Sequence, residues 1–193
     1  MNGRRDIKTS VINATTELIT EIGINDLTTA KIAERSRTAE TVIYRHFKNK
    51  QDVINKAISF RLGELHKEFE TINNQPLPAI LRLENLLDAH LSFNEKTKGF
   101  SRVAFSDQLH LGDRELKEIA KSRQEKYEFL MIDLIRDGIK EGVFRPDLDT
   151  KTAAQSYIGL IYFVMHKWSF DDFSWDLLNE KERMLQYWTK EWK

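Results

Sequence analysis

The sequence predicts an all-α protein with an N-terminal three-helix helix-turn-helix domain followed by a larger helical domain. Only three Pro and eight Gly occur in 193 residues, so few positions interrupt a helix. Long stretches are rich in Leu, Ile, Glu and Lys, which favour helix over strand. With 40% hydrophobic and 31% charged residues, the chain has the composition of a globular protein and the length to bury a core.

Two helices are expected before residue 37. Apolar side chains recur on one stripe over residues 8–22, which predicts a helix, and Gly23 supplies its C-terminal stop. Thr28 or Thr29 can accept hydrogen bonds from free backbone N–H groups and so begin a short second helix that ends near Ser36.

A third short helix runs to Phe47, with Ile43 one turn earlier on the same inward face. Two short helices joined by a tight turn and braced by a longer one form a helix-turn-helix unit. A long fourth helix follows Lys50 and ends near Glu70, before the polar, double-proline loop 73–78. The other predicted helices span 78–96, 100–110, 113–141, 150–169 and 175–192. We therefore divide the chain into residues 1–50 and 51–193.

Charge is distributed unevenly between these two parts. The whole chain carries 30 basic and 30 acidic side chains, yet residues 1–50 hold nine Lys and Arg against six Asp and Glu. A local basic patch on a neutral protein fits a small phosphate-contacting module attached to a larger body. On charge alone, a solvated helix surface is the simpler explanation.

Several classes of protein and site are not expected. The chain has no Cys, which excludes disulfides, thiolate metal sites and a Cys nucleophile. Its longest nearly unbroken apolar run has nine residues, whereas a membrane helix needs about 20. The N-terminus has no apolar segment of a secretory signal, so we expect a cytoplasmic protein. Metalloprotease, phosphate-loop and serine-hydrolase motifs are missing and the five His are scattered, so we expect no enzyme, cofactor or metal.

The segment 26–54, DLTTAKIAERSRTAETVIYRHFKNKQDVI, resembles the DNA-binding domain of TetR-family transcriptional regulators. The resemblance is strongest over IYRHFKNKQDVI, and IAERS matches the second helix of that domain. It implies a ligand-responsive regulator, in most cases a repressor, that binds a palindromic operator as a homodimer and is released by a small effector. The alternative is a DNA-binding protein of the same type that a protein partner controls without a small effector.

Two residues depart from the family pattern in the turn of the motif. Arg37 stands where Gly is usual, and a turn that needs a positive φ costs a non-Gly residue about 1 kcal/mol. Ala39 stands where a helix cap is usual, and we expect Thr38 to supply that cap instead. Arg37 also brings a cation that can contact phosphate.

The resemblance and helical geometry together predict the DNA surface. Glu40, Thr41 and Val42 are expected to read base edges, with Glu40 accepting from a cytosine amino group. Tyr44 and Lys50 are expected to hold phosphates. The full predicted set is Thr28, Thr29, Arg37, Thr38, Glu40, Thr41, Val42, Tyr44, Arg45, His46, Lys48 and Lys50. Simple packing remains an alternative for Tyr44, and a place at the edge of the core for His46.

The larger domain is expected to bind the effector and form the dimer. Polar side chains among aromatic neighbours are candidates for contact with a largely apolar molecule. They are His90, Phe93, Asn94, Arg102, Phe105, His110, Tyr162 and His166. Ordinary core packing is the alternative for each. Broad apolar sets on helices 120–141 and 150–168 favour these as dimer elements, although burial within one subunit also explains some positions.

Overall fold

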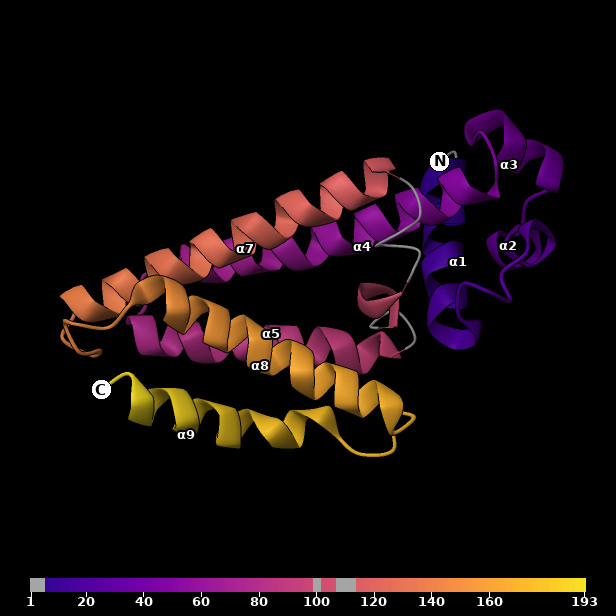
Figure 1. Ribbon diagram of the computed structural model, residues 1–193. Helices are drawn as coiled ribbons and strands as arrows, with labels where there is room; N and C mark the ends of the chain where they lie inside the picture. The colour runs from indigo at the N-terminus through magenta and orange to yellow at the C-terminus, as the bar shows by residue number, and fades with distance from the viewer. Residues whose placement is uncertain (1–5, 99–101, 107–113) are drawn as a thin grey trace.

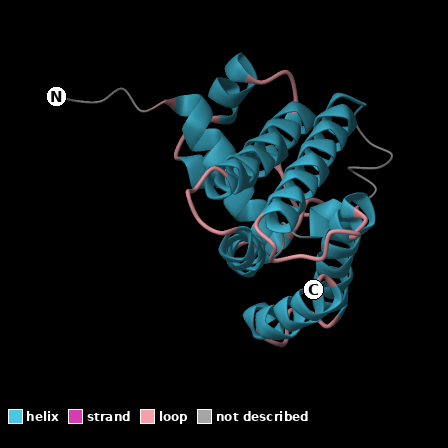
Figure 2. Ribbon diagram, turned by 90° about the vertical axis from the view of Figure 1, so that its left-hand side faces the viewer, coloured by secondary structure: helices cyan, strands magenta, loops and turns pink. Residues whose placement is uncertain are grey.

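A computed structural model describes residues 6–98, 102–106 and 114–193 of the protein. Within these ranges the chain forms helices and short connections, and no strand occurs among them (Figure 2). The helical elements are α1 (Ile7–Ile22), α2 (Thr29–Ser36), α3 (Glu40–His46), α4 (Lys50–Asn73), α5 (Ala79–Lys96), η1 (Arg102–Phe105), α7 (Arg114–Lys140), α8 (Thr150–Phe170), η3 (Leu177–Glu180) and α9 (Lys181–Glu191). The predicted all-α fold class is confirmed.

The helices form a small N-terminal unit and a longer bundle (Figure 1). Helices α1, α2 and α3 lie together at one end of the molecule, whereas α5, α7, α8 and α9 form the bundle. Helix α4 packs against α1 at one end and against α5 and α7 along the rest of its length. None of the described helices combines the length and the apolar character that a membrane crossing requires.

Side-chain caps begin the first two helices. Asp6 accepts from the backbone N–H of Lys8 to cap α1, and Thr28 accepts from that of Lys31 at 3.2 Å to cap α2. At the end of α1, Gly23 adopts φ 77°, a left-handed value that glycine tolerates without a Cβ penalty. The stop at Gly23 and the Thr28 cap are therefore confirmed.

The turn between α2 and α3 carries the expected positive φ. Arg37 adopts φ 55° and ψ 47°, in the left-handed region, and Thr38 donates its backbone N–H to the carbonyl of Ala33 at 3.0 Å. The expected cap is wrong, because α3 begins at N-cap Ala39 with no side-chain hydrogen bond. The side chain of Thr38 therefore does not replace the missing cap, and α3 depends on packing for its start.

Two hydrophobic cores share helix α4. Ile43 and Phe47 of the motif are buried in the first core together with Val53 and Ile58 from the first half of α4. The second half of α4 belongs to the larger core through residues such as Phe69. Burying each large apolar side chain contributes about 1.5–3 kcal/mol, so α4 is held firmly by both cores.

The far end of α4 is anchored by a buried arginine. Arg82 of α5 is 7% exposed and donates to the carbonyl of Asn73 at 3.0 Å. It also forms an ion pair with Asp137 of α7 at 3.1 Å. This end of α4 is therefore fixed to the bundle, whereas the end that leads to α3 packs in the first core.

The broad apolar sets proposed for the dimer lie mostly inside the subunit. Met131 and Ile135 of α7 and Ile161 of α8 are fully buried in the larger core. Gly138 of α7 allows the Phe144 ring to pack directly against the helix backbone, since a Cβ there would lie 2.2 Å from that ring. Burial within one chain therefore explains why apolar residues cover so much of the surface of α7 and α8.

One predicted helix is wrong in the part that the structure describes. Instead of a helix through residues 100–110, η1 ends at Phe105, and Ser106 lies outside it. The Ser106 hydroxyl donates to the Val103 carbonyl at 2.8 Å, which competes with helical hydrogen bonding. The final helix also starts later than expected, because η3 precedes α9.

Candidate DNA interface and effector region

The outward face of α3 carries the predicted base-reading residues. Glu40, Thr41 and Arg45 are exposed and Val42 is half-buried, while Ile43 lies in the core. Since Ile43 fixes the rotation of the helix, these side chains all point away from the protein body. The face has the size and polarity of a segment that enters a major groove.

Tyr44 combines an exposed ring with a fixed hydroxyl. The residue is 51% exposed, and its hydroxyl forms a 3.1 Å hydrogen bond with the hydroxyl of Thr29. Thr29 itself is 8% exposed, so its role is to join α2 to α3 rather than to present a free hydroxyl. Tyr44 is therefore held in place at the surface and not packed in the core.

The predicted phosphate-contacting lysines flank the start of α4. Lys48 and Lys50 are both exposed, and the Lys50 ammonium donates to the carbonyl of Leu27 at 3.0 Å. That bond uses one of three ammonium donors and orients the remaining two. Asn49 caps α4 by accepting from the backbone N–H of Asp52 at 2.8 Å, which fixes the backbone between the two lysines.

The other predicted DNA residues surround this surface. Arg37 is exposed, Thr38 and His46 are half-buried, and the Thr28 hydroxyl is occupied in capping α2. One cation of the basic patch is neutralised, because Arg35 pairs with Glu21 at 2.6 Å and with Glu17 at 3.4 Å. The charge of the patch is therefore smaller than the sequence count suggests.

A buried polar cluster lies in the larger domain. His90 of α5 is fully buried, and its Nδ1 lies 3.2 Å from the hydroxyl of Tyr127 of α7. Phe69 of α4 stacks on the Tyr127 ring with centroids 4.5 Å apart. Burial lowers the pKa of His90 to about 4, so the imidazole is neutral at pH 7. Asn94, one turn from His90, is also buried and donates to the His90 carbonyl.

Two buried polar atoms near this cluster lack a good partner. Within the described residues, neither the Tyr157 hydroxyl nor the Trp188 Nε1 makes a well-formed hydrogen bond, although the Tyr157 hydroxyl interacts with that of Tyr127. Their rings pack with centroids 4.4 Å apart. Burial raises the pKa of Tyr157 above its usual range, so the hydroxyl stays protonated. A buried donor without a partner costs stability, and a bound ligand atom can relieve that cost.

The remaining predicted effector residues are spread between interior and surface. Phe93 and Tyr162 are half-buried, and Phe93 packs against both cores. Arg102 and His166 lie at the surface instead of the interior: Arg102 pairs with Asp172 at 2.8 Å, and His166 packs on Phe170. The side chain of Phe105 and the whole of His110 lie outside the described residues.

The family of the chain follows from two sequence profiles. The profile described as "Bacterial regulatory proteins, tetR family" matches residues 11–57, which include the helix-turn-helix. The profile described as "Tetracyclin repressor-like, C-terminal domain" matches residues 76–169. The chain belongs to the TetR family. As a TetR-family member it is a DNA-binding transcriptional regulator, and the resemblance of segment 26–54 is confirmed.

Relatives of this TetR-family protein match it over most of its length. The "Fatty acid metabolism regulator protein" of Bacillus subtilis (strain 168) is 25% identical over 188 residues, covering 96% of this chain and 95% of the relative. A "Nucleoid occlusion factor SlmA" of Marinobacter nauticus is 28% identical over 153 residues, which cover 79% of this chain and 76% of the relative.

Solved structures share the TetR fold. The fatty acid degradation regulator FadR from Bacillus halodurans superposes with a TM-score of 0.80 at 22% identity, covering 97% of each chain. FadR from Bacillus subtilis, solved in complex with stearoyl-CoA, gives 0.77 at 24% identity, covering 94% of this chain and 97% of that one.

Sequence reasoning missed the polar role of three residues in this TetR-family protein. Tyr127 and Tyr157 belong to the broad apolar sets of the predicted helices 120–141 and 150–168, and Trp188 lies in the predicted helix 175–192, so the sequence marks none of them as a polar contact. Their polar atoms meet His90 or face the core from α7, α8 and α9. The sequence did contain one indication: a tyrosine on the buried face of a helix has a hydroxyl that needs a hydrogen-bond partner.

Proposed function

We propose that the protein is a repressor that binds a palindromic operator as a homodimer and is released by a small, largely apolar effector. The observation that carries this proposal is the position of α4, which contributes to both cores and begins at Lys50 beside the DNA surface. A ligand that changes the packing of the larger core acts on the same helix that positions α3. The protein therefore has a physical link between two sites.

The proposed roles of the DNA-contacting residues follow from which side chains are exposed. Glu40, Thr41 and Val42 read base edges, while Tyr44, Lys48 and Lys50 hold phosphates. Thr28, Thr29, Arg37, Thr38, Arg45 and His46 complete the interface. Residues 1–50 form the DNA-binding domain and residues 51–193 the effector and dimer domain, although the small core also uses the first half of α4.

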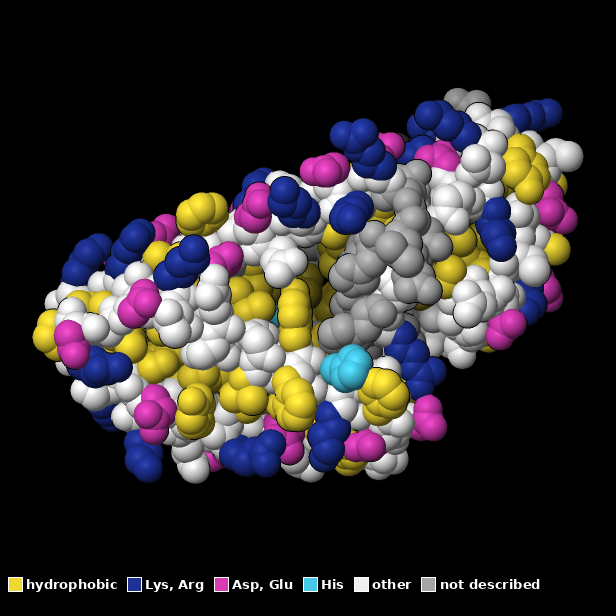
Figure 3. All heavy atoms as spheres, in the orientation of Figure 1, with side chains coloured by type: hydrophobic (Ala, Val, Ile, Leu, Met, Phe, Trp, Pro, Cys, Tyr) yellow, Lys and Arg dark blue, Asp and Glu magenta, His cyan; other side chains and the backbone are white. Residues whose placement is uncertain are grey.

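A second copy of the chain is the proposed partner. Exposed aromatic rings lie on α8 at Phe163 (65% exposed) and Phe170 (74% exposed), and on α9 at Tyr187 (52% exposed). Hydrophobic side chains gather along α8 on the face drawn in Figure 3. Exposed aromatic side chains that lie near other apolar residues favour a contact with another protein. Two copies also double the surface on DNA, which one small module cannot provide alone.

The proposed effector is a long-chain acyl thioester. A fully buried cluster of aromatic and neutral polar groups around His90 and Tyr127 suits an apolar chain with one polar atom. One relative from Bacillus subtilis is named a regulator of fatty acid metabolism, and FadR from Bacillus subtilis was solved in complex with stearoyl-CoA. These observations support the class of effector rather than one compound.

The experiment that tests the proposal is release of DNA by effector. A palindrome selected from random DNA is labelled, and its fluorescence polarisation with the protein is followed as stearoyl-CoA is added. We expect the polarisation to fall to that of free DNA. An operator complex that stayed intact at saturating stearoyl-CoA would refute acyl thioesters as the releasing effector.

The nucleoid occlusion relatives favour one alternative function. A TetR-family DNA-binding protein controlled by a protein partner needs no effector, and it agrees with the 28% identity to SlmA. Under either function the protein acts on DNA and catalyses no reaction. A protein that acts on bacterial DNA is expected in the cytoplasm, and we propose that location. Within the described residues no group of three or more His, Asp or Glu side chains is placed to hold a metal.

A further inference from the structure

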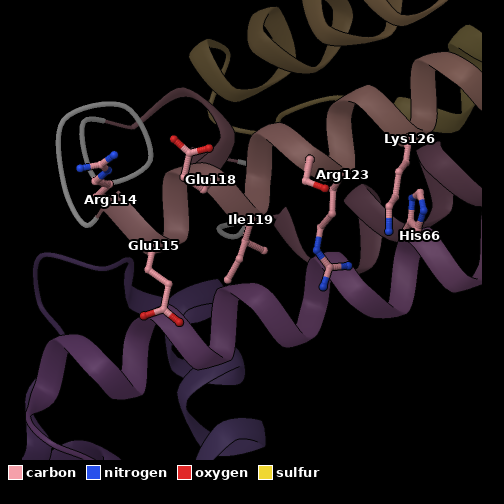
Figure 4. A pocket seen from close by; sticks show the side chains of 8 residues that line it. His66, Arg114, Glu115, Glu118, Ile119, Arg123 and Lys126 are labelled. Carbon is pink, nitrogen blue, oxygen red and sulfur yellow. The ribbon is translucent and has the colours of Figure 1, made fainter.

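A groove of about 840 Å³ lies between α4 and α7 (Figure 4). One end is lined by His66 of α4 and by Arg123 and Lys126 of α7. The other end carries Arg114, Glu115 and Glu118, where the charges are of both signs. The groove is therefore cationic at one end only.

The two cations at that end are unpaired within the described part of the chain. Neither Arg123 nor Lys126 forms an ion pair or hydrogen bond there, whereas Arg136, farther along α7, pairs with Asp133 at 3.1 Å. Arg123 is half-buried, and in Figure 4 its side chain extends from α7 toward α4. Burial without a counter-ion lowers the pKa of Arg123. A charge held in this way favours an incoming anion.

The guanidinium of Arg123 lies against the α4 backbone at Gly63. A Cβ at that glycine would lie 3.2 Å from both terminal nitrogens of Arg123, so the absence of a side chain makes room for the planar group. Both α4 and α7 thus shape the position of this cation. A guanidinium held beside the backbone in this way still has other N–H donors for a ligand.

Charged neighbours act on the pKa of His66 in both directions. Burial lowers the pKa of His66, and the charges of Arg123 and Lys126 lower it further. Glu70 acts in the opposite direction, since its carboxylate lies 3.2 Å from Nε2 of His66 and pairs with the imidazole when that ring is protonated. Arg123 and Lys126 are thus the standing charges of this end, and a bound anion would offset their repulsion and favour protonation of His66.

This cationic end adjoins the buried cluster proposed for the effector. Lys126 precedes Tyr127 on α7, and His66 lies one turn before Phe69 on α4. Phe69 and Tyr127 stack on each other in the core, while His66 and Lys126 line the groove on its outer side. An amphiphile with an apolar chain in the core and a charged head in the groove would contact the same two helices throughout.

We propose that His66, Arg123 and Lys126 bind a phosphate-bearing head group of the effector. The inference rests on the proposed acyl effector and adds that this effector is an anionic amphiphile. Arginine binds phosphate through two parallel N–H donors, and lysine adds a point charge beside it. A phosphate held by α7 and His66 would tie α4 to α7, so the head group would also bias the position of α4.

Two probes that share an acyl chain separate the head group from the chain. Stearoyl-CoA carries phosphates, whereas stearoyl-N-acetylcysteamine has the same thioester without them. Binding of each is measured by calorimetry on the full-length protein and on Arg123→Gln and Lys126→Gln. Lys121→Gln is the matched control, because Lys121 is an exposed cation of α7 that does not line the groove.

We expect Arg123→Gln and Lys126→Gln each to weaken stearoyl-CoA binding by roughly tenfold or more. The same variants should bind the phosphate-free thioester as the wild type does, and Lys121→Gln should bind both probes normally. Wild-type affinity for stearoyl-CoA should fall with added salt. Unchanged stearoyl-CoA affinity in both groove variants would overturn the phosphate site while leaving the acyl effector intact.

Inorganic pyrophosphate, the third probe, distinguishes the two proposals when the acyl probes fail. Binding of pyrophosphate that Arg123→Gln abolishes would support the phosphate site, even if neither thioester bound and the acyl effector were wrong. A wild-type protein that bound none of the three probes would refute both the phosphate site and the acyl effector.

Discussion

Replacing Arg37 by glycine should stabilise the protein. Arg37 is exposed and adopts φ 55° and ψ 47°, where a Cβ meets the neighbouring carbonyl and glycine carries no such penalty. The cost for a non-glycine residue in this region is about 1–2 kcal/mol. Because glycine is also more flexible when unfolded, we expect a net gain in the free energy of unfolding of about 1 kcal/mol.

The matched variants separate strain from charge. Arg37→Ala removes the guanidinium but keeps the strained backbone, and Arg37→Lys keeps both the charge and the strain. Urea unfolding followed by circular dichroism should rank Arg37→Gly above the other two, which should resemble the wild type. In operator titrations, Arg37→Gly and Arg37→Ala should both lower the salt slope by about one per subunit, because each loses a phosphate contact. A glycine variant no more stable than Arg37→Ala would refute the strain argument.

Three further predictions concern packing, pH and DNA. Gly138→Ala should lower the free energy of unfolding by about 1–3 kcal/mol, because its Cβ would overlap the buried ring of Phe144. Gly159→Ala is the control, since Gly159 has open space around it and the variant should not be destabilised. Equal stability of the two variants would contradict the close packing at Gly138. The pKa of His90 is lowered to about 4 in the folded state, so the unfolded chain binds the extra proton. Stability should therefore fall as pH drops from about 6.5 toward 4, and His90→Asn should flatten that part of the urea-midpoint profile. Lys50→Ala should weaken binding to all DNA sequences and lower the salt slope, whereas Glu40→Ala should change the preferred base; selection experiments on both variants would expose a reversed pattern.

Local features of the sequence were sufficient to predict the small unit. The inward face of α3 follows from Ile43 and Phe47 one turn apart, and the start of α2 follows from Thr28. The positive φ at Arg37 followed from resemblance to a family that has glycine there. The expected Thr38 cap failed, because a cap depends on the direction in which the side chain leaves the turn, which no pattern of residue types specifies.

Contacts between distant helices were beyond sequence reasoning. His90 meets Tyr127 across α5 and α7, with Phe69 of α4 against the same ring. Periodicity predicts that such residues face inward but not which side chains they contact. The same limit placed Arg102 and His166 in the expected effector region, although both lie at the surface. His90 and Tyr127, 37 positions apart in sequence, become neighbours only when the helix packing is known.

The proposed competition between effector and operator through α4 is tested by titrating stearoyl-CoA into the protein alone and into its operator complex. Linkage requires that operator weaken effector binding by the same factor by which effector weakens operator binding. For coupling of about 1–3 kcal/mol, the two affinities for stearoyl-CoA should differ by roughly 5- to 150-fold. Equal affinities in the two titrations would rule out coupling through α4 and favour control by a protein partner.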